Sequence, residues 1–157
     1  MMFLKKLINK TTFSVCIIIA ITTLFSNCKN KELNKDQLIQ SIIKDSLAYR
    51  GNYKKIVVLT DIGCPTCQTH LSEFIEESTT ESEDVLYVIN SSEKIVDLSH
   101  LRNNSKNIVF DNKKLFYNYN LVHGSAAFFI DNNGKIVETI PLDNPASIQE
   151  NLSKIKD

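Results

Sequence analysis

The sequence is poor in the residues that mark several large classes of protein. Its 157 residues include only 4 glycines and 3 prolines, and it contains no low-complexity block and no internal repeat. The formal net charge is zero and no basic run is present, so nothing in the composition supports nucleic-acid binding. Only 4 cysteines are present, which makes the position of each one informative.

The first residues have the pattern of an export signal. Lys5, Lys6 and Lys10 form a basic start, and residues 13–26 are nearly all apolar or small, a stretch too short for a comfortable membrane span. Cys28 follows directly, in "LFSNCKNK", and this segment resembles a bacterial lipoprotein signal, in which the cysteine becomes the lipidated first residue after cleavage. An uncleaved anchor helix and ordinary cleavage nearby are the alternatives. All three interpretations export the rest of the chain.

We therefore expect three parts: a signal peptide at 1–27, a tether with an N-terminal helix at 28–52, and one domain at 53–157. Residues 28–157 carry 15 basic and 18 acidic residues, a net charge of −3. The predicted location is the cell envelope, with a lipid anchor in a bacterial membrane, either in the periplasm or associated with the outer membrane. Such surroundings permit disulfides.

The cysteine count isolates one pair of thiols. Cys16 lies in the leader and Cys28 is the predicted lipid site, which leaves Cys64 and Cys67, in "TDIGCPTCQTHL". A structural disulfide stabilises a protein mainly by closing a long loop in the unfolded chain. Two intervening residues close a short loop, so the spacing argues against a staple.

Hydrophobic periodicity and turn signals predict the order of the elements. We expect, in order, a helix from Asn34 to Arg50 with Gln37 in a capping box, a strand at 54–62, a helix starting at the cysteine pair, a strand at 84–90, a helix at 91–101, a short strand at 107–111, a short helix or turn at 112–120, a β-hairpin at 126–142 turning at Asn133 and Gly134, and a helix capped by Asn144 and Pro145. A β-α-β unit favours parallel strands.

This order, with Cys-x-x-Cys at the first strand-to-helix junction, resembles the thioredoxin fold over residues 53–157. "VVLTDIGCPTC" is similar to the active-site segment of periplasmic disulfide isomerases. "FDNKKLFYNYNLVHGSAAFFIDNNGKIV" is similar to the second half of exported reductases of the TlpA and redoxin type, and the absence of a long helical insertion fits this second group better. The resemblance implies an α/β domain with a central mixed sheet flanked by helices, preceded here by an N-terminal helical extension.

Two positions depart from the family pattern. Ala126, in "HGSAAF", stands where these oxidoreductases usually have a cis-proline, and Gly63 replaces the aromatic residue common before the first cysteine. A non-proline cis bond costs about 3 kcal/mol, so we expect the bond between Ser125 and Ala126 to be trans. Ser125 and Ala126 are the predicted substrate loop.

The thiols have distinct expected roles. At a helix N-terminus, unpaired N–H groups and the helix dipole favour a thiolate, so Cys64 is the predicted nucleophile. Cys67, one turn into the helix, is the predicted resolving thiol, and Pro65 fits the first helical position. The resulting hypothesis is an enzyme, a thiol-disulfide oxidoreductase with no cofactor. Its expected partners are a protein thiol or disulfide, a membrane electron-transfer protein, and the membrane itself through the lipid.

Three alternatives stay open at this point. Cys64 and Cys67 could join His70 or His123 in a copper or zinc carrier, which would resemble distantly the exported copper chaperones of thioredoxin fold, although those have three residues between their cysteines. Ala126 and the missing aromatic residue are also compatible with a redox-inactive interaction module. Finally, a pair of cysteines can simply fill space in a core.

Overall fold

The computed structural model describes residues 34–78, 84–90, 98, 100–101 and 105–156. The chain divides into two units, Met1–Glu32 and Leu33–Asp157, and every described residue lies in the second. The predictions for the signal peptide at 1–27, for Cys28 and for most of the helix at 91–101 fall outside the described residues. Of the helices that the structure describes, none is long and apolar enough to cross a membrane.

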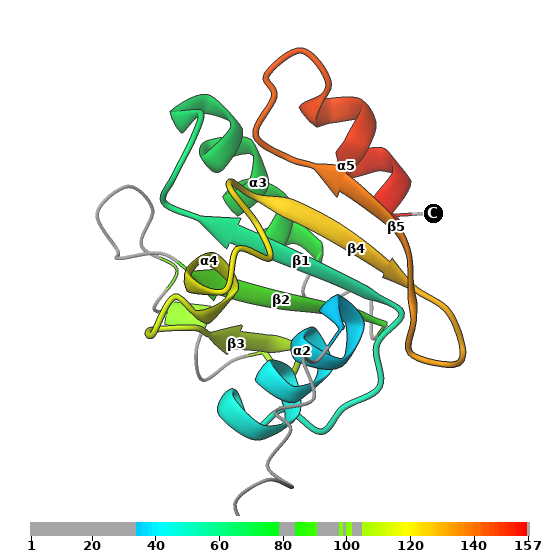
Figure 1. Ribbon diagram of the computed structural model, residues 1–157. Helices are drawn as coiled ribbons and strands as arrows, with labels where there is room; N and C mark the ends of the chain where they lie inside the picture. Colours follow the sequence, from blue (N-terminus) through cyan, green and yellow to red (C-terminus); the bar gives the residue numbers. More distant parts are fainter. Residues whose placement is uncertain (1–33, 79–83, 91–97, 99, 102–104, 157) are drawn as a thin grey trace, which may run out of the picture. The chain divides into compact units, whose positions relative to one another are not determined.

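The described elements follow the predicted order (Figure 1). They are α2 (Lys35–Ser41), η1 (Ile42–Ser46), β1 (Lys55–Thr60), α3 (Pro65–Ser78), β2 (Val85–Asn90), β3 (Ile108–Phe110), α4 (Leu115–Asn118), β4 (Ala126–Ile130), β5 (Ile136–Pro141) and α5 (Ile148–Lys156). Most differ from the predicted ranges by a residue or two at their ends, because the pattern of apolar residues places an element more firmly than it places the terminal hydrogen bonds.

The N-terminal helix starts where the sequence predicts and ends earlier. The Oδ1 atom of Asn34 accepts a hydrogen bond from the backbone N–H of Gln37 at 2.8 Å, which confirms the cap. The α-helix then widens into the π-helical turn η1, and Ala48 takes a left-handed conformation with φ of 55°. The prediction that this helix runs to Arg50 is therefore wrong, since a left-handed residue breaks the helical hydrogen-bond pattern.

The strands form one mixed sheet in the order β3-β2-β1-β4-β5. β1 pairs parallel with β2, and β2 pairs parallel with β3, as the β-α-β pattern predicts. β4 is antiparallel both to β1, with Val58 opposite Ala126, and to β5. Pro141, which has no N–H, lies in β5 at the edge of the sheet, where one face of the backbone needs no partner.

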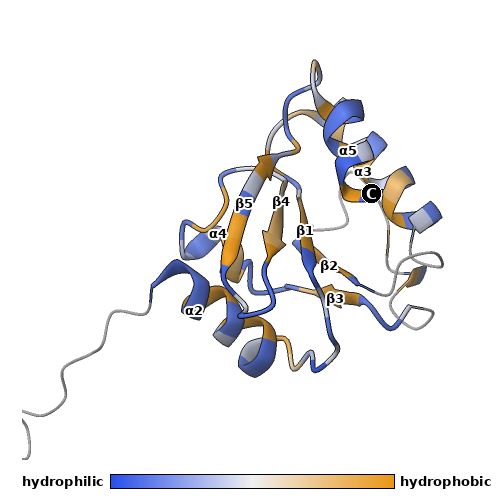
Figure 2. Ribbon diagram, turned by 90° about the vertical axis from the view of Figure 1, so that its right-hand side faces the viewer, coloured by the Kyte–Doolittle hydropathy of each residue, from blue (hydrophilic) through white to orange (hydrophobic). Residues whose placement is uncertain are grey.

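Helices cover both faces of the sheet (Figure 2). Successive strand residues point to opposite faces, so Val57 and Leu59 of β1 join one apolar cluster and Ile56 and Val58 join the other. The first cluster packs against α3 and α5, and the second against α2, η1 and α4. This arrangement confirms the expected α/β, thioredoxin-like class, with α2 as the N-terminal helical extension.

One edge of the sheet gathers the chain segments that carry the predicted site. The parallel strands β1, β2 and β3 all end there, β4 begins there, and the antiparallel β5 ends there. The segments that meet at this edge are residues 61–64, 111–114, 124–125 and 142–143. We call this edge the carboxyl edge.

Candidate active site

A tight turn at the carboxyl edge delivers Cys64 to the start of α3. After β1 ends at Thr60, Gly63 adopts a φ of 106°, a conformation that a residue with a side chain rarely takes. Pro65 is then the first residue of α3, as predicted. The backbone that this turn requires therefore explains why a glycine precedes Cys64.

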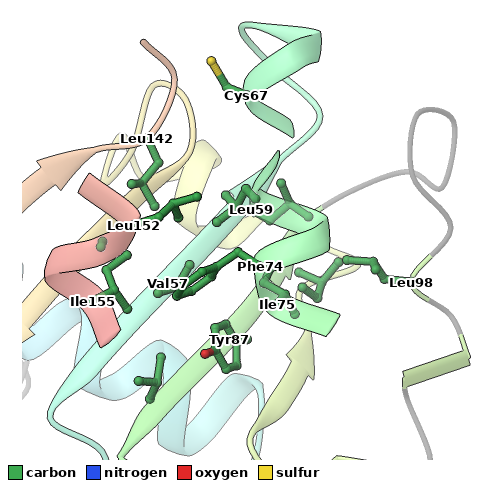
Figure 3. Packing of buried hydrophobic residues seen from close by; sticks show 14 of the residues in the cluster. Val57, Leu59, Cys67, Phe74, Ile75, Tyr87, Leu98, Leu142, Leu152 and Ile155 are labelled. Carbon is green, nitrogen blue, oxygen red and sulfur yellow. The ribbon is translucent and has the colours of Figure 1, made fainter. Parts of the chain in front are cut away.

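The two thiols are adjacent and differ in exposure. The backbone N–H of Cys67 donates a hydrogen bond to the Sγ atom of Cys64 at 3.2 Å. Cys64 is partly exposed, whereas Cys67 is 1% exposed and lies at the end of the apolar cluster under α3 and α5 (Figure 3). Both are free thiols in this structure. The sequence-based assignment of an outer and an inner thiol agrees with these positions.

This environment pushes the pKa values of the two thiols apart. The pKa of Cys64 is lowered, first by a hydrogen bond from the Cys67 thiol and then by the backbone N–H groups of Cys67 and Thr66. Burial raises the pKa of Cys67 to about 11, and the proximity of the Cys64 anion adds to the increase. Cys64 is therefore the thiol that ionises more easily and Cys67 the one that keeps its proton to higher pH, which is the division of labour that thiol exchange needs.

The predicted substrate loop lies beside the turn and is pinned to it. The Oγ atom of Ser125 accepts a hydrogen bond from the buried N–H of Thr60 at 3.0 Å, and its carbonyl accepts one from the N–H of Leu142 at 2.8 Å. No cis peptide bond occurs among the described residues, so the bond between Ser125 and Ala126 is trans, as expected. Both side chains are buried, at 3% and 8% exposure, so they position the carboxyl edge from inside rather than from its surface.

An ion pair holds the other side of the turn. Lys114 Nζ lies 2.9 Å and 3.1 Å from the two carboxylate oxygens of Asp61, whose side chain is only 12% exposed. Lys114 itself has a left-handed φ of 52°, and its N–H donates to the carbonyl of Asp111. Asp111 also accepts a hydrogen bond from Phe116 N–H at 3.1 Å. Asp61, which lies two residues before Gly63, is thus already paired with a cation.

Asp143 is a further residue at the site, which the sequence analysis missed. A Cβ atom built on Gly63 would lie 3.4 Å from the Asp143 Cβ, and one built on Gly124 would lie 3.0 Å from the Asp143 Cγ and closer still to Oδ2. Its negative charge acts on both Cys64 and Cys67. The predicted hairpin could have indicated that Asp143 lies at the site, because the strand that follows the Asn-Gly turn has to return to the carboxyl edge.

The histidines of the metal alternative do not join the cysteines in a cluster. His70 Nδ1 lies 3.6 Å from Glu73 on the outer side of α3, and His123 is exposed. Within the part of the chain that the structure describes, no group of three or more His, Cys, Asp or Glu residues could hold a metal ion. No observation here favours the copper or zinc carrier.

No family model and no curated protein matches the sequence. Among solved structures, a protein assigned as thiol:disulfide interchange protein DsbE from Chlorobium tepidum is similar at 16% identity and a TM-score of 0.40, over 69% of this chain and 81% of that chain. The exposed lipoprotein thioredoxin of Streptococcus pneumoniae shares 23% identity at 0.34, over 68% and 87%. BsSco, of the Sco family of cytochrome c oxidase assembly proteins, shares 14% at 0.34, over 65% and 77%. The strand order, the register and the layered helices give this chain a thioredoxin-like fold.

Proposed function

We propose that the protein is a thiol-disulfide oxidoreductase in which Cys64 is the nucleophile and Cys67 the resolving thiol. The observation that carries this proposal is the asymmetric pair: a partly exposed Sγ that accepts the Cys67 N–H, next to a buried thiol with a raised pKa. A pair of cysteines that only filled core space would have both thiols buried and neither one stabilised as an anion.

The exchange balances in two steps. The Cys64 thiolate attacks one sulfur of a substrate disulfide, the substrate S–S bond breaks, and the departing sulfur leaves as a thiolate that takes a proton from water. Cys67 then loses its proton to water and attacks Cys64 Sγ, which forms the Cys64–Cys67 disulfide and releases the second substrate thiol. Two electrons pass from the protein to the substrate, whose two sulfurs take their protons from water, and the reverse sequence oxidises a dithiol.

The experiment compares insulin reduction by the full chain with reduction by Cys64→Ser. The variant should lose the activity, because a serine hydroxyl is not a thiolate at neutral pH. Cys28→Ser is the matched control, since it replaces a cysteine outside the pair, and it should keep the activity. Equal rates for the wild type and Cys64→Ser would refute the proposal and favour the redox-inactive module.

We also propose that the protein is exported and tethered to the envelope through a lipid on Cys28. The support is the sequence alone: a basic start, an apolar run and a cysteine directly after it. A protein thiol or disulfide is the proposed substrate, and a membrane electron-transfer protein the proposed source or acceptor of electrons. Metabolic labelling with a radioactive fatty acid tests the anchor: wild-type chain should take up label and Cys28→Ser should not. Label on both variants, or on neither, would contradict it.

A further inference from the structure

Asp143 lies against the active-site turn because Gly63 and Gly124, which face it, have no side chains. It follows the end of β5, and its carboxyl group occupies the space beside Gly124 where any larger residue would place a Cβ. A Cβ atom on Gly63, the residue that precedes Cys64, would be in ordinary van der Waals contact with the Asp143 Cβ. The hydrogen bond from Leu142 N–H to the Ser125 carbonyl fixes the segment on which Asp143 is carried. The carboxylate is therefore built into the site rather than loosely near it.

No cation of the described residues neutralises the charge of Asp143. Asp61, the other acid at the turn, is paired with Lys114, and His123 is exposed in the loop that carries Gly124. Among the described residues, no ion pair and no hydrogen bond engages the Asp143 carboxylate. Among the described residues, the groups that act on the Cys64 anion are therefore the Cys67 thiol and the N–H groups at the start of α3, which stabilise it, and the weaker Asp143 charge, which opposes them.

We infer that Asp143 is a positioning residue that biases the Cys64–Cys67 couple toward its disulfide, which makes the pair a stronger electron donor than the same pair without this charge. The inference rests on the proposed function. A fixed negative charge destabilises the Cys64 thiolate and leaves the neutral disulfide unaffected. Destabilising the reduced form favours oxidation of the couple, because the equilibrium depends only on the difference between the two states.

The donor reaction balances as follows. The two thiols of Cys64 and Cys67 lose two electrons and two protons and form one S–S bond, while one substrate S–S bond breaks and the two sulfurs take up two protons as thiols. A dithiol of lower reduction potential must then reduce Cys64–Cys67 again, which is the role of the proposed electron-transfer partner. The class of substrate that this bias favours is an oxidised, disulfide-bonded protein.

An electrostatic role has a pH signature that a packing role lacks. When Cys64 is protonated, the reduced form carries no thiolate for Asp143 to destabilise, so removing the charge changes nothing. As the pH rises through the pKa of Cys64, the anion forms and the effect of Asp143 appears. It then stays constant, because Cys64 is fully ionised, until Cys67 begins to titrate at about 11. A change in packing would act on both sides of that transition.

The experiment equilibrates the full chain with glutathione buffers between about pH 5 and pH 9 and measures the fraction of Cys64–Cys67 disulfide. At alkaline pH, Asp143→Asn should lower the equilibrium constant for disulfide formation about three- to tenfold, the size expected for one unit charge that is largely screened by water. At the acidic end it should match the wild type. Asp143→Glu keeps the charge and should restore the wild-type constant. Asp36→Asn removes an acid from the first turn of α2 and should have no effect at any pH.

An Asp143→Asn curve that coincides with the wild type, or one displaced equally at every pH, would overturn the inference and leave the proposed function standing. A wild-type chain that forms no Cys64–Cys67 disulfide in any glutathione buffer would overturn the proposed function itself, and the inference with it. Loss of the effect at low pH together with rescue by glutamate supports it.

Discussion

The backbone N–H of Cys67 points at the Sγ atom of Cys64, 3.2 Å away, so the inner cysteine stabilises the anion of the outer one. The Cys67 thiol makes a second, stronger contribution through its own hydrogen bond. A helix that begins at Pro65 provides this arrangement, because the first N–H groups of a helix have no partner within the helix. A substitution of Cys67 therefore removes the hydrogen bond from its thiol and keeps the hydrogen bond from its backbone N–H.

Replacing Cys67 should raise the pKa of Cys64. In Cys67→Ala the backbone N–H still reaches Cys64 Sγ, but the thiol donor is lost, so the anion is less stable. Cys67→Ser retains a donor and should raise the pKa less than alanine does. The rate of Cys64 alkylation by iodoacetamide as a function of pH measures both. If alanine and serine give the same midpoint as the wild type, the hydrogen bond from the Cys67 thiol does not contribute.

The reduced protein should become less stable at alkaline pH because of Cys67. The pKa of Cys67 rises from an ordinary 9.0 to about 11 on folding, first because of burial. The unfolded chain therefore releases this proton before the folded one, so the stability that the protonated thiol contributes is complete below pH 9.0 and is lost as the pH rises to about 11. Urea unfolding of the reduced chain at several pH values measures the slope. Cys67→Ala should lack this component, and an unchanged slope in the variant would contradict the assignment.

Ser125→Ala should destabilise the protein by about 1–3 kcal/mol, because the substitution leaves the buried N–H of Thr60 without an acceptor. Urea unfolding measures the change. Ser153→Ala is the matched control: its hydroxyl donates to the carbonyl of Glu150 at an exposed position of α5, so its removal should cost less than about 0.5 kcal/mol. Equal losses in the two variants would mean that Ser125 does not pin the turn.

Leu142→Ala should cost about 2–5 kcal/mol, because Leu142 is fully buried in the cluster under α3 and α5 and truncation leaves a cavity. Figure 3 shows this side chain close to the end of the cluster that holds Cys67. Val137→Ala, on the same hairpin, is the control, since Val137 is 63% exposed and should tolerate the change within about 0.5 kcal/mol. A loss of similar size at Val137 would show that the hairpin contributes to stability mainly through its exposed face.

The sequence predicts much of the fold because its signals are local. The run of β-branched residues before Cys64 predicts β1, and Asn133 with Gly134 predicts the hairpin, where Gly134 N–H bonds the carbonyl of Asp131 and φ is 79°. The predicted start of the last helix is too early, since Asn144 caps a turn through Ala146 N–H and α5 begins at Ile148. The cap residues of this turn resemble those of a helix, and only the hydrogen bonds of the residues that follow distinguish a capped turn from a helix start.

By itself the sequence determined the placement of the pair: two thiols with a short spacing, at the junction of a strand and a helix, with Cys67 on the buried stripe. Tertiary structure decided what surrounds them. Asp143 lies 79 residues after Cys64 in the chain and reaches the site only because β5 runs antiparallel to β4 and ends at the carboxyl edge. Ser125 supports Thr60 for the same reason, across the β1–β4 pairing. Such contacts depend on sheet register, and the register is fixed by burial, because a slip of one residue would turn the buried apolar side chains of a strand to the opposite face of the sheet.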